Sequence, residues 1–383
     1  MSFWGEGEDG PRDEMRTRVE GILQGPVLEV LKSSQMASLS SVVLVDVRTD
    51  VPTGSLLVSV VDQPNTSLYA QRLDAPSKFI DAASPSHIPA ICELESIIFL
   101  SALESDSTGV YLVKTKNDAP PVVLKLLLPT DFLLHSDEEA FSFTARLAAM
   151  YREILVLSTI PPHPNIIDCP VALVTISHLH GQLVCGFLSS FHPGGTIASA
   201  IEPVTPADTP SLERRIRWAA QMASAIFHLH LVAHTYHGDI KLDNIILSAN
   251  DNAVFIDFEQ VRHAKECLAP EACGAWDVVL TNSAARDFVG ATTTATISYV
   301  PYTGPEREET WSAYEAWAMY PEALEAIEVY SLGDALKTLF EGTCLPNKVR
   351  TIIEQCMAEE PEARPRLDFI LAGMRELCPE VDQ

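Results

Sequence analysis

The sequence is poor in basic residues: 26 lysines and arginines stand against 52 aspartates and glutamates, and the formal net charge is −26. Nucleic acids and anionic membranes bind basic surfaces, so we expect neither as a partner. No apolar run approaches the roughly 18 residues that a membrane span needs. The first residues, MSFWGEGEDGPRDE, lack the basic-then-apolar order of a secretory signal. The eight cysteines include no CxxC pair, which favours reduced thiols. We therefore expect a soluble intracellular protein, cytoplasmic or nuclear.

The chain nevertheless contains enough apolar residues to fold, because 47% of its 383 residues are hydrophobic and 20% are charged. Residues 1–91 differ in character from the rest, and we interpret them as an N-terminal extension of unknown role. The patterns there predict a helix within 14–39, strands at 41–47 and 55–61 around a turn at 52–54, and then a long proline-interrupted connection.

Residues 92–383 show a more regular order of elements. The predicted strands cover 97–103, 110–114, 121–127, 171–177 and 182–189, with a helix over 138–160. The later predicted helices cover 211–232, 322–340, 348–357 and 367–377. The predicted fold class is therefore α+β, with a small β-rich lobe over about 92–190 and a larger, mainly helical lobe over about 191–383.

The strongest chemical signal is HGDIKLDNIIL at 237–247, followed by VFIDFEQ at 254–260. These segments contain Asp239, Lys241, Asn244 and Asp257, which are all groups that phosphoryl transfer can use. Transfer from ATP needs oxygen ligands for magnesium, a carboxylate to orient the attacking hydroxyl, and cations for the phosphates. Short spacing suits this reaction, because its catalysis is mostly positioning and electrostatics.

In these motifs the sequence resembles the eukaryotic protein kinases, from Cys92 to the end of the chain. His237-Gly238-Asp239 with Asn244 matches the catalytic-loop pattern H-R-D-x-x-x-x-N, and Asp257-Phe258-Glu259 matches the DFG element. Upstream, VVLK ends at Lys125 like the V-A-I-K strand, and YREILVLSTIPPHPNII resembles the helix C region. FHPGGTI, EVYSLG and MAEEPEARP resemble the hinge, helix F and the late Arg-Pro motif.

The resemblance implies a bilobal, ATP- and magnesium-dependent kinase that transfers the γ-phosphate of ATP to Ser or Thr hydroxyls of protein substrates. Asp239 would be the catalytic carboxylate that orients the substrate hydroxyl, and Lys241 would contact the γ-phosphate. The presence of Lys241 favours serine/threonine over tyrosine kinases. Asn244 and Asp257 would hold magnesium. The acidic charge of the chain favours basic segments as substrates.

The same resemblance implies the residues that would bind the nucleotide. Lys125 would bind the α- and β-phosphates of ATP, and Glu153 would brace it from helix C. Val110, Val123 and Ile246 would sandwich the adenine.

The sequence also departs from the family pattern. The segment SALESDSTGVY at 101–111 has one glycine where the family has three, and its Glu104 and Asp106 would repel triphosphate. Glu259 replaces the DFG glycine and adds negative charge beside the magnesium ligands. Gly238 replaces the arginine that receives an activation-loop phosphate in the family, so we expect activity that is independent of such phosphorylation.

A literal APE motif occurs at 269–271, only twelve residues after Glu259. We interpret it as a chance match, and we expect Glu306, in YTGPE, to be the acid that pairs with Arg364. Glu328 replaces the helix F aspartate that braces the catalytic loop, and its longer side chain is expected to reach that loop.

Four histidines fall close together at His228, His230, His234 and His237. A zinc site needs its ligands arranged around one point, and this spacing does not ensure that. We expect His237 to hold the catalytic loop in place.

Two other functions remain open on the sequence. A pseudokinase that binds partners is favoured by the degraded glycine loop and by Glu259. A small-molecule kinase related to choline or aminoglycoside phosphotransferases is favoured by HGD…N followed by IDFE, which those families also contain.

Overall fold

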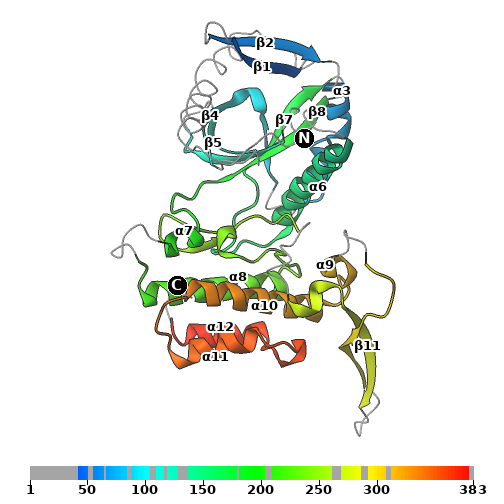
Figure 1. Cartoon of the computed structure of the whole chain (residues 1–383), viewed down its shortest axis with the longest axis vertical. Coiled ribbons are helices and arrows are strands. Elements are labelled where there is room, and N and C mark those ends of the chain that lie inside the picture. Colours follow the sequence, from blue (N-terminus) through cyan, green and yellow to red (C-terminus); the bar gives the residue numbers. More distant parts are fainter. Residues whose placement is uncertain are drawn as a thin grey trace. The chain divides into compact units, whose positions relative to one another are not determined.

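The structure is a computed structural model, and it describes residues 42–50, 55–63, 66–83, 88–103, 109–115, 119–127, 137–178, 181–202, 209–260, 269–285, 292–307 and 312–378 (Figure 1). The described residues divide into two compact units, one within residues 1–72 and 176–182, and the other within residues 73–175 and 183–383. The predicted helix within 14–39 and the turn at 52–54 lie outside the described residues.

The first unit contains an antiparallel hairpin of β1 (Val42–Asp50) and β2 (Ser55–Gln63), followed by α3 (Thr66–Arg72). Both predicted strands are therefore confirmed. Valine is the commonest residue in the two strands, as expected of a β-branched residue with high β-propensity.

The predicted connection up to residue 90 is wrong in part, because α3 and the short α4 (Ser77–Ile80) form within it. Phe79 of α4 is fully buried, and its ring meets that of Tyr151 edge-on at 4.8 Å. The Tyr151 hydroxyl in turn donates to Val184 O and accepts from Asp74 N–H. Residues 73–83 thus pack within the second unit, and the expected extension over 1–91 stays a prediction.

The second unit contains a mixed six-stranded sheet in the order β3-β7-β8-β6-β5-β4. The strands are β3 (Ala90–Glu93), β4 (Ile97–Ala102), β5 (Val110–Thr115), β6 (Val122–Leu126), β7 (Ala172–His178) and β8 (Gly181–Ser190). The tips of β7 and β8 belong to the first unit. Strand β3 pairs parallel with β7, whereas β4, β5, β6 and β8 pair antiparallel in succession. The five strands predicted beyond residue 92 are confirmed.

Strand β6 shows why this sheet presents a polar site on an apolar framework. Leu124 and Leu126 are buried on one face of the strand. Val123 and Lys125, which alternate with them along the strand, lie on the other face. Helix α6 (Asp137–Thr159) follows β6 in the chain and confirms the predicted helix over 138–160.

The remaining elements of the second unit are mainly helical. They are α7 (Ile197–Ile201), α8 (Leu212–Leu231), the hairpin of β9 (Ile245–Leu247) and β10 (Ala253–Phe255), α9 (Ala313–Ala316), α10 (Pro321–Leu339), α11 (Asn347–Cys356) and α12 (Leu367–Arg375). Helix α8 packs against α10 and α12, and α10 also packs against α11 (Figure 1). The four long helices predicted beyond residue 210 are confirmed. Among the described residues, none of the helices combines the length and apolarity that crossing a bilayer demands.

A further hairpin, which the sequence did not lead us to predict, consists of β11 (Trp276–Ala285) and β12 (Thr292–Pro301). Arg307 anchors its base by donating to Gly274 O and Trp276 O, and its guanidinium lies 3.8 Å from the centre of the Tyr302 ring. The run of threonines and other β-branched residues in β12 was the available sequence signal.

Candidate functional site

Lys125 lies among three carboxylates contributed by two separate parts of the chain. Its Nζ atom is 2.7 Å from Glu153 Oε2 of α6, 2.6 Å from Asp257 Oδ1 and 3.9 Å from Glu259 Oε1. Oxygen atoms of the three acids lie within 4.8 Å of one another. Glu153 is almost fully buried, whereas the Glu259 side chain is 47% exposed, so the cluster opens toward solvent on the Glu259 side.

The charges in this cluster shift one another's pKa. Burial alone would lower the pKa of Lys125, but Glu153, Asp257 and Glu259 outweigh it and raise that pKa, so the ammonium is held protonated. Burial likewise opposes ionisation of Asp257, and the adjacent Lys125 outweighs it and lowers the Asp257 pKa. Glu259 differs, because burial together with Asp257 and Glu153 raises its pKa to about 7 against the pull of Lys125.

Glu153 also ties α6 to the segment that contains Asp257. Its Oε1 atom accepts a hydrogen bond of 3.3 Å from the backbone N–H of Phe258, while its Oε2 atom binds Lys125. The Phe258 ring is fully buried and lies 4.7 Å from the ring of His237. One carboxylate therefore connects the sheet, α6 and the 257–259 segment.

The loop at 237–244 holds Asp239 by one of its two carboxylate oxygens. Asp239 Oδ2 accepts from Lys241 Nζ at 2.6 Å and from Asn244 Nδ2 at 2.8 Å, and the same Asn244 amide donates to the Asp239 backbone carbonyl. Asp239 Oδ1 is shielded from solvent and has no hydrogen-bond partner among the described residues. A buried anionic oxygen without a donor is costly, so this atom is suited to accept a proton or hydrogen bond from a bound hydroxyl.

Hydrogen bonds from His237 and Glu328 hold this loop in place. His237 is fully buried, its Nε2 bonds Ile256 O at 2.9 Å, and its Nδ1 accepts from Asp239 N–H. Glu328 Oε1, on α10, accepts from the backbone N–H groups of His237 and Gly238 at 2.9 and 2.6 Å. The expectations that His237 holds the loop and that Glu328 reaches it are both confirmed.

A third contact of the Glu328 carboxylate comes from His230. His230 Nε2 lies 2.7 Å from Glu328 Oε2. Burial alone would raise the pKa of Glu328, but this hydrogen bond and the electrostatic effect of His230 and His237 outweigh it and lower the pKa. His228 instead bonds Pro161 O, so among the described residues the histidines do not converge on one point as zinc ligands would.

The predicted adenine residues lie in the sheet and in β9. Val110 of β5 pairs directly opposite Lys125, and Val123 is two residues before it on β6, so all three share one face of the sheet. Ile246 lies in β9, where it pairs with Val254. All three apolar side chains are only partly buried. Their joint contact with a nucleotide stays a prediction.

Gly109 has a structural role that the sequence analysis missed. Its φ is +72°, its carbonyl accepts from Leu126 N–H, and a Cβ atom built on it would lie 2.0 Å from Leu126 O. The glycine is therefore required for close approach of β5 to the end of β6. Glu104 and Asp106, which were expected to repel triphosphate, lie outside the described residues.

The expected pairing of Glu306 with Arg364 is wrong. Glu271, in the motif that we interpreted as a chance match, binds Arg364 through two contacts, Nη1–Oε1 at 2.5 Å and Nη2–Oε2 at 2.8 Å. Both side chains are at least 98% buried, whereas Glu306 is exposed. The physical reason is that the β11–β12 hairpin is inserted after residue 271, so the segment from Asp257 to Glu271 is short and the residues near 306 lie beyond the hairpin.

No protein-family model matches the sequence, and no curated protein matches it.

Proposed function

We propose that this chain is a eukaryotic protein kinase-like enzyme with a bilobal kinase fold, which transfers the γ-phosphate of ATP to serine or threonine hydroxyls of protein substrates with magnesium as cofactor. One observation carries the proposal: Lys125 Nζ lies between Glu153 Oε2 and Asp257 Oδ1, at 2.7 and 2.6 Å. Protein kinases require a strand lysine paired with a helix C glutamate, together with the DFG aspartate in place.

The arrangement of elements supports the same proposal. Lys125 lies on the third strand of the β4-β5-β6 series, and α6, which supplies Glu153, follows that strand. Asp239 and Asn244 lie in one short loop before β9, and Asp257 comes two residues after the end of β10. This is the chain order in which kinases place their lysine, glutamate, catalytic loop and DFG aspartate.

The residues of this chain would act as follows. Asp239 Oδ1, which has no partner among the described residues, accepts the proton of the substrate hydroxyl as that oxygen bonds to the γ-phosphorus. The bond from the γ-phosphorus to the oxygen bridging it to the β-phosphate breaks, and ADP leaves. Lys241, held 2.6 Å from Asp239 Oδ2, supplies positive charge to the transferring phosphoryl group, and Lys125 supplies it to the α- and β-phosphates.

The donor set fits a magnesium ion bound with nucleotide. Asp257 is a carboxylate whose lowered pKa keeps it ionised, and Asn244 offers an amide oxygen, both hard ligands of the kind that magnesium prefers. Magnesium would neutralise charge developing on the phosphate oxygens. Glu259 adds a second carboxylate beside these groups, within 4.8 Å of Asp257.

The test is magnesium-dependent transfer of labelled γ-phosphate from ATP to mixed basic peptides. Asp239→Asn and Lys125→Met should each lower transfer at least about a hundredfold, because each removes a group that acts in the transition state. The matched controls are Asp243→Asn, an exposed aspartate in the same loop, and Lys114→Met on the neighbouring strand β5. The controls should retain activity. Absence of transfer by the wild-type chain would contradict the proposal.

A pseudokinase is the second candidate, and a specific observation favours it. Glu259 places a further carboxylate 3.9 Å from the lysine that would bind phosphate. Nucleotide would then have to compete with three acids for Lys125. A wild-type chain that shows no thermal stabilisation by ATP and magnesium would favour this reading, since a ligand that binds the folded state raises its melting temperature. ATP consumption only with an amino alcohol or aminoglycoside would favour a small-molecule kinase instead.

A further inference from the structure

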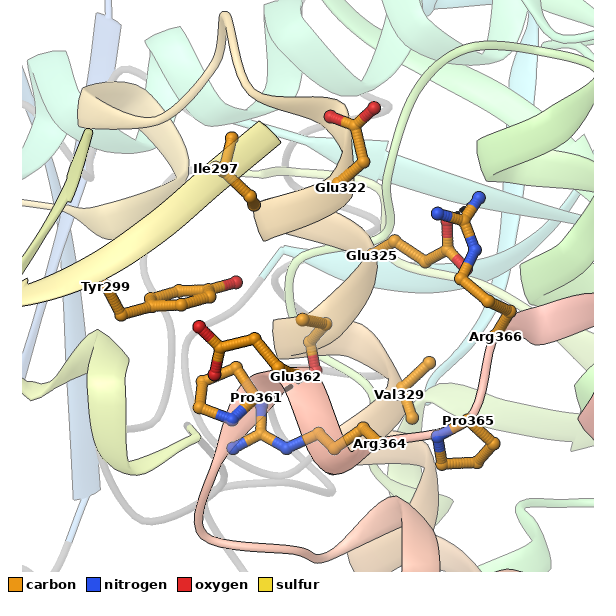
Figure 2. A pocket seen from close by; sticks show the side chains of 11 residues that line it. Ile297, Tyr299, Glu322, Glu325, Val329, Pro361, Glu362, Arg364, Pro365 and Arg366 are labelled. Carbon is orange, nitrogen blue, oxygen red and sulfur yellow. Dashed lines mark hydrogen bonds and ion pairs between the residues drawn. The ribbon is translucent and has the colours of Figure 1, made fainter. Parts of the chain in front are cut away.

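A pocket of about 160 Å³ lies where β12 meets the first half of α10 and residues 361–366 (Figure 2). That volume is on the order of ten times what a single water requires. Its walls include Ile297, Tyr299, Glu322, Val329, Glu362 and Pro365. Because Ile297 and Tyr299 belong to the inserted hairpin, the pocket exists only through that insertion, and the proposed phosphoryl transfer uses none of these residues.

The two arginines that line the pocket are already neutralised. Arg364 binds Glu271 through both Nη atoms, and Arg366 lies 3.1 Å from Glu325. Glu322 and Glu362 remain exposed and form no ion pair with any described residue. The pocket therefore carries an excess of negative charge, which excludes an anionic ligand.

Tyr299 contributes a buried polar group to this pocket, which a patch of exposed surface acids does not have. Its hydroxyl oxygen is shielded from solvent and has no hydrogen-bond partner among the described residues. Figure 2 shows the hydroxyl directed from β12 toward the middle of the lining side chains. Burial raises the pKa of Tyr299, and Glu271, Glu362 and Glu322 add to that effect against Arg364, so the phenol stays neutral. An unsatisfied buried hydroxyl costs free energy that a ligand donor would recover.

A guanidinium group suits these walls better than other cations do. It is planar, presents five N–H donors, and stacks on aromatic faces while bonding to carboxylates. A metal ion needs several ligand atoms gathered around one point, and among the described residues the only such cluster is the one around Lys125. The net charge of −26 further favours approach of a basic segment.

We propose that this pocket binds an arginine side chain from a basic segment of a partner protein, with Glu322 and Glu362 as charge partners and Tyr299 as both a stacking wall and a hydrogen-bond partner. This binding needs neither nucleotide nor phosphoryl transfer. Its failure would therefore leave the proposed kinase activity untouched, and loss of that activity would leave the pocket intact.

The test uses the full chain without nucleotide and a fluorescein-labelled glycine/alanine peptide with one central arginine. The peptide contains no hydroxyl residue, so it cannot be a substrate. A second peptide contains citrulline, which has the shape of arginine without the charge. Fluorescence anisotropy should show at least about tenfold tighter binding of the arginine peptide, the factor that corresponds to one charge-assisted hydrogen bond.

Variants then locate the binding. Glu322→Gln combined with Glu362→Gln should weaken binding of the arginine peptide to the level of the citrulline peptide, and Tyr299→Phe should weaken it about threefold by loss of one hydrogen bond. The matched control is Glu213→Gln combined with Glu354→Gln, two exposed glutamates on α8 and α11 that change the net charge equally. Melting temperatures near that of the wild type would verify that each variant folds.

Two results would overturn the proposal. Equal binding of the arginine and citrulline peptides to the wild type, a comparison that needs no variant, would exclude recognition of the cation. Equal weakening by the pocket pair and the control pair would assign the binding to the general negative field of the chain.

Discussion

Glu271 and Arg364 form a two-contact ion pair across 93 residues of sequence, with side chains only 2% and 1% exposed. The guanidinium also donates to the carbonyls of Ala326 and Ala358 and lies over the ring of Tyr330 at 5.0 Å. The pair thereby joins the segment before the β11–β12 hairpin to α10 and to the turn before α12. Arginine suits this position because its planar fork matches a carboxylate through two parallel bonds.

Replacing Glu271 with alanine should lower the free energy of unfolding by about 3–5 kcal/mol, because it leaves a buried guanidinium without its counter-charge. Glu306→Ala is the matched control, since that glutamate is exposed and its loss should change stability by less than about 0.5 kcal/mol. Urea unfolding of the two variants measures the difference. Similar losses in both would contradict the assignment of Glu271 as the partner of Arg364.

The contrast between Glu271 and the helices shows what sequence can predict here. Helices such as α11 and α12 bury one stripe of residues, and strands such as β6 bury alternate ones, so local periodicity was sufficient to find them. The pairing of Arg364 depends on where a hairpin of 26 residues, Trp276 to Pro301, is inserted in the chain. Local periodicity carries no information about the position of such an insertion. Spacing along the sequence therefore led us to predict Glu306, and not Glu271, as the partner of Arg364.

The local geometry of the 237–244 loop was easier to predict than its surroundings, because the residues that form it are close together in sequence. Asp239, Lys241 and Asn244 fall within six residues, and the structure joins all three by hydrogen bonds. The meeting of Asp257 with Lys125 and Glu153 was inferable only from the resemblance, because these three residues are remote from one another in sequence. The Tyr299 pocket had no sequence signal, since its walls come from β12, α10 and residues 361–366.

Glu328→Ala should destabilise the chain by about 2–4 kcal/mol, because two backbone N–H groups and His230 then lose a buried charged acceptor. Transfer activity should fall as well, since these bonds hold the loop that bears Asp239. Glu328→Gln keeps the acceptor oxygen and should retain more of the stability than alanine does. Equal stability of wild type and Glu328→Ala in urea would show that the hydrogen bonds of Glu328 contribute nothing to the free energy of unfolding.

Gly109→Ala should cost about 1–3 kcal/mol of stability, because its φ of +72° disfavours a side chain and the new Cβ would meet Leu126 O. Gly342→Ala is a close control: its φ is +69°, and no atom lies within 4 Å of a Cβ built there. The difference between the two losses of stability measures the cost of the steric clash with Leu126 O, because the cost of a positive φ is nearly the same in both variants. If both variants lost the same stability, the close approach of β5 to β6 would not be what requires glycine.

Glu259 should make stability depend on pH near neutrality. Its pKa is raised from 4.5 to about 7 in the folded chain, so between these values the folded state binds the proton more tightly than the unfolded state does. Stability should therefore fall as pH rises from 4.5 to 7, and the full penalty should remain above 7. Glu259→Gln removes this ionisation, so it should stabilise the chain more at pH 8 than at pH 5. Because the side chain is 47% exposed, solvent screening reduces the difference to about 1 kcal/mol.

Thermal unfolding of the wild type and Glu259→Gln at both pH values measures this difference, in metal-free buffer so that no cation neutralises the acids. Glu354→Gln, on the exposed side of α11, controls for the general loss of one negative charge. The gain from Glu259→Gln should grow from pH 5 to pH 8, whereas the effect of the control should stay nearly constant. A Glu259→Gln gain of the same size at both pH values would mean that Glu259 titrates outside this range, and that Lys125 holds it ionised as firmly as it holds Asp257.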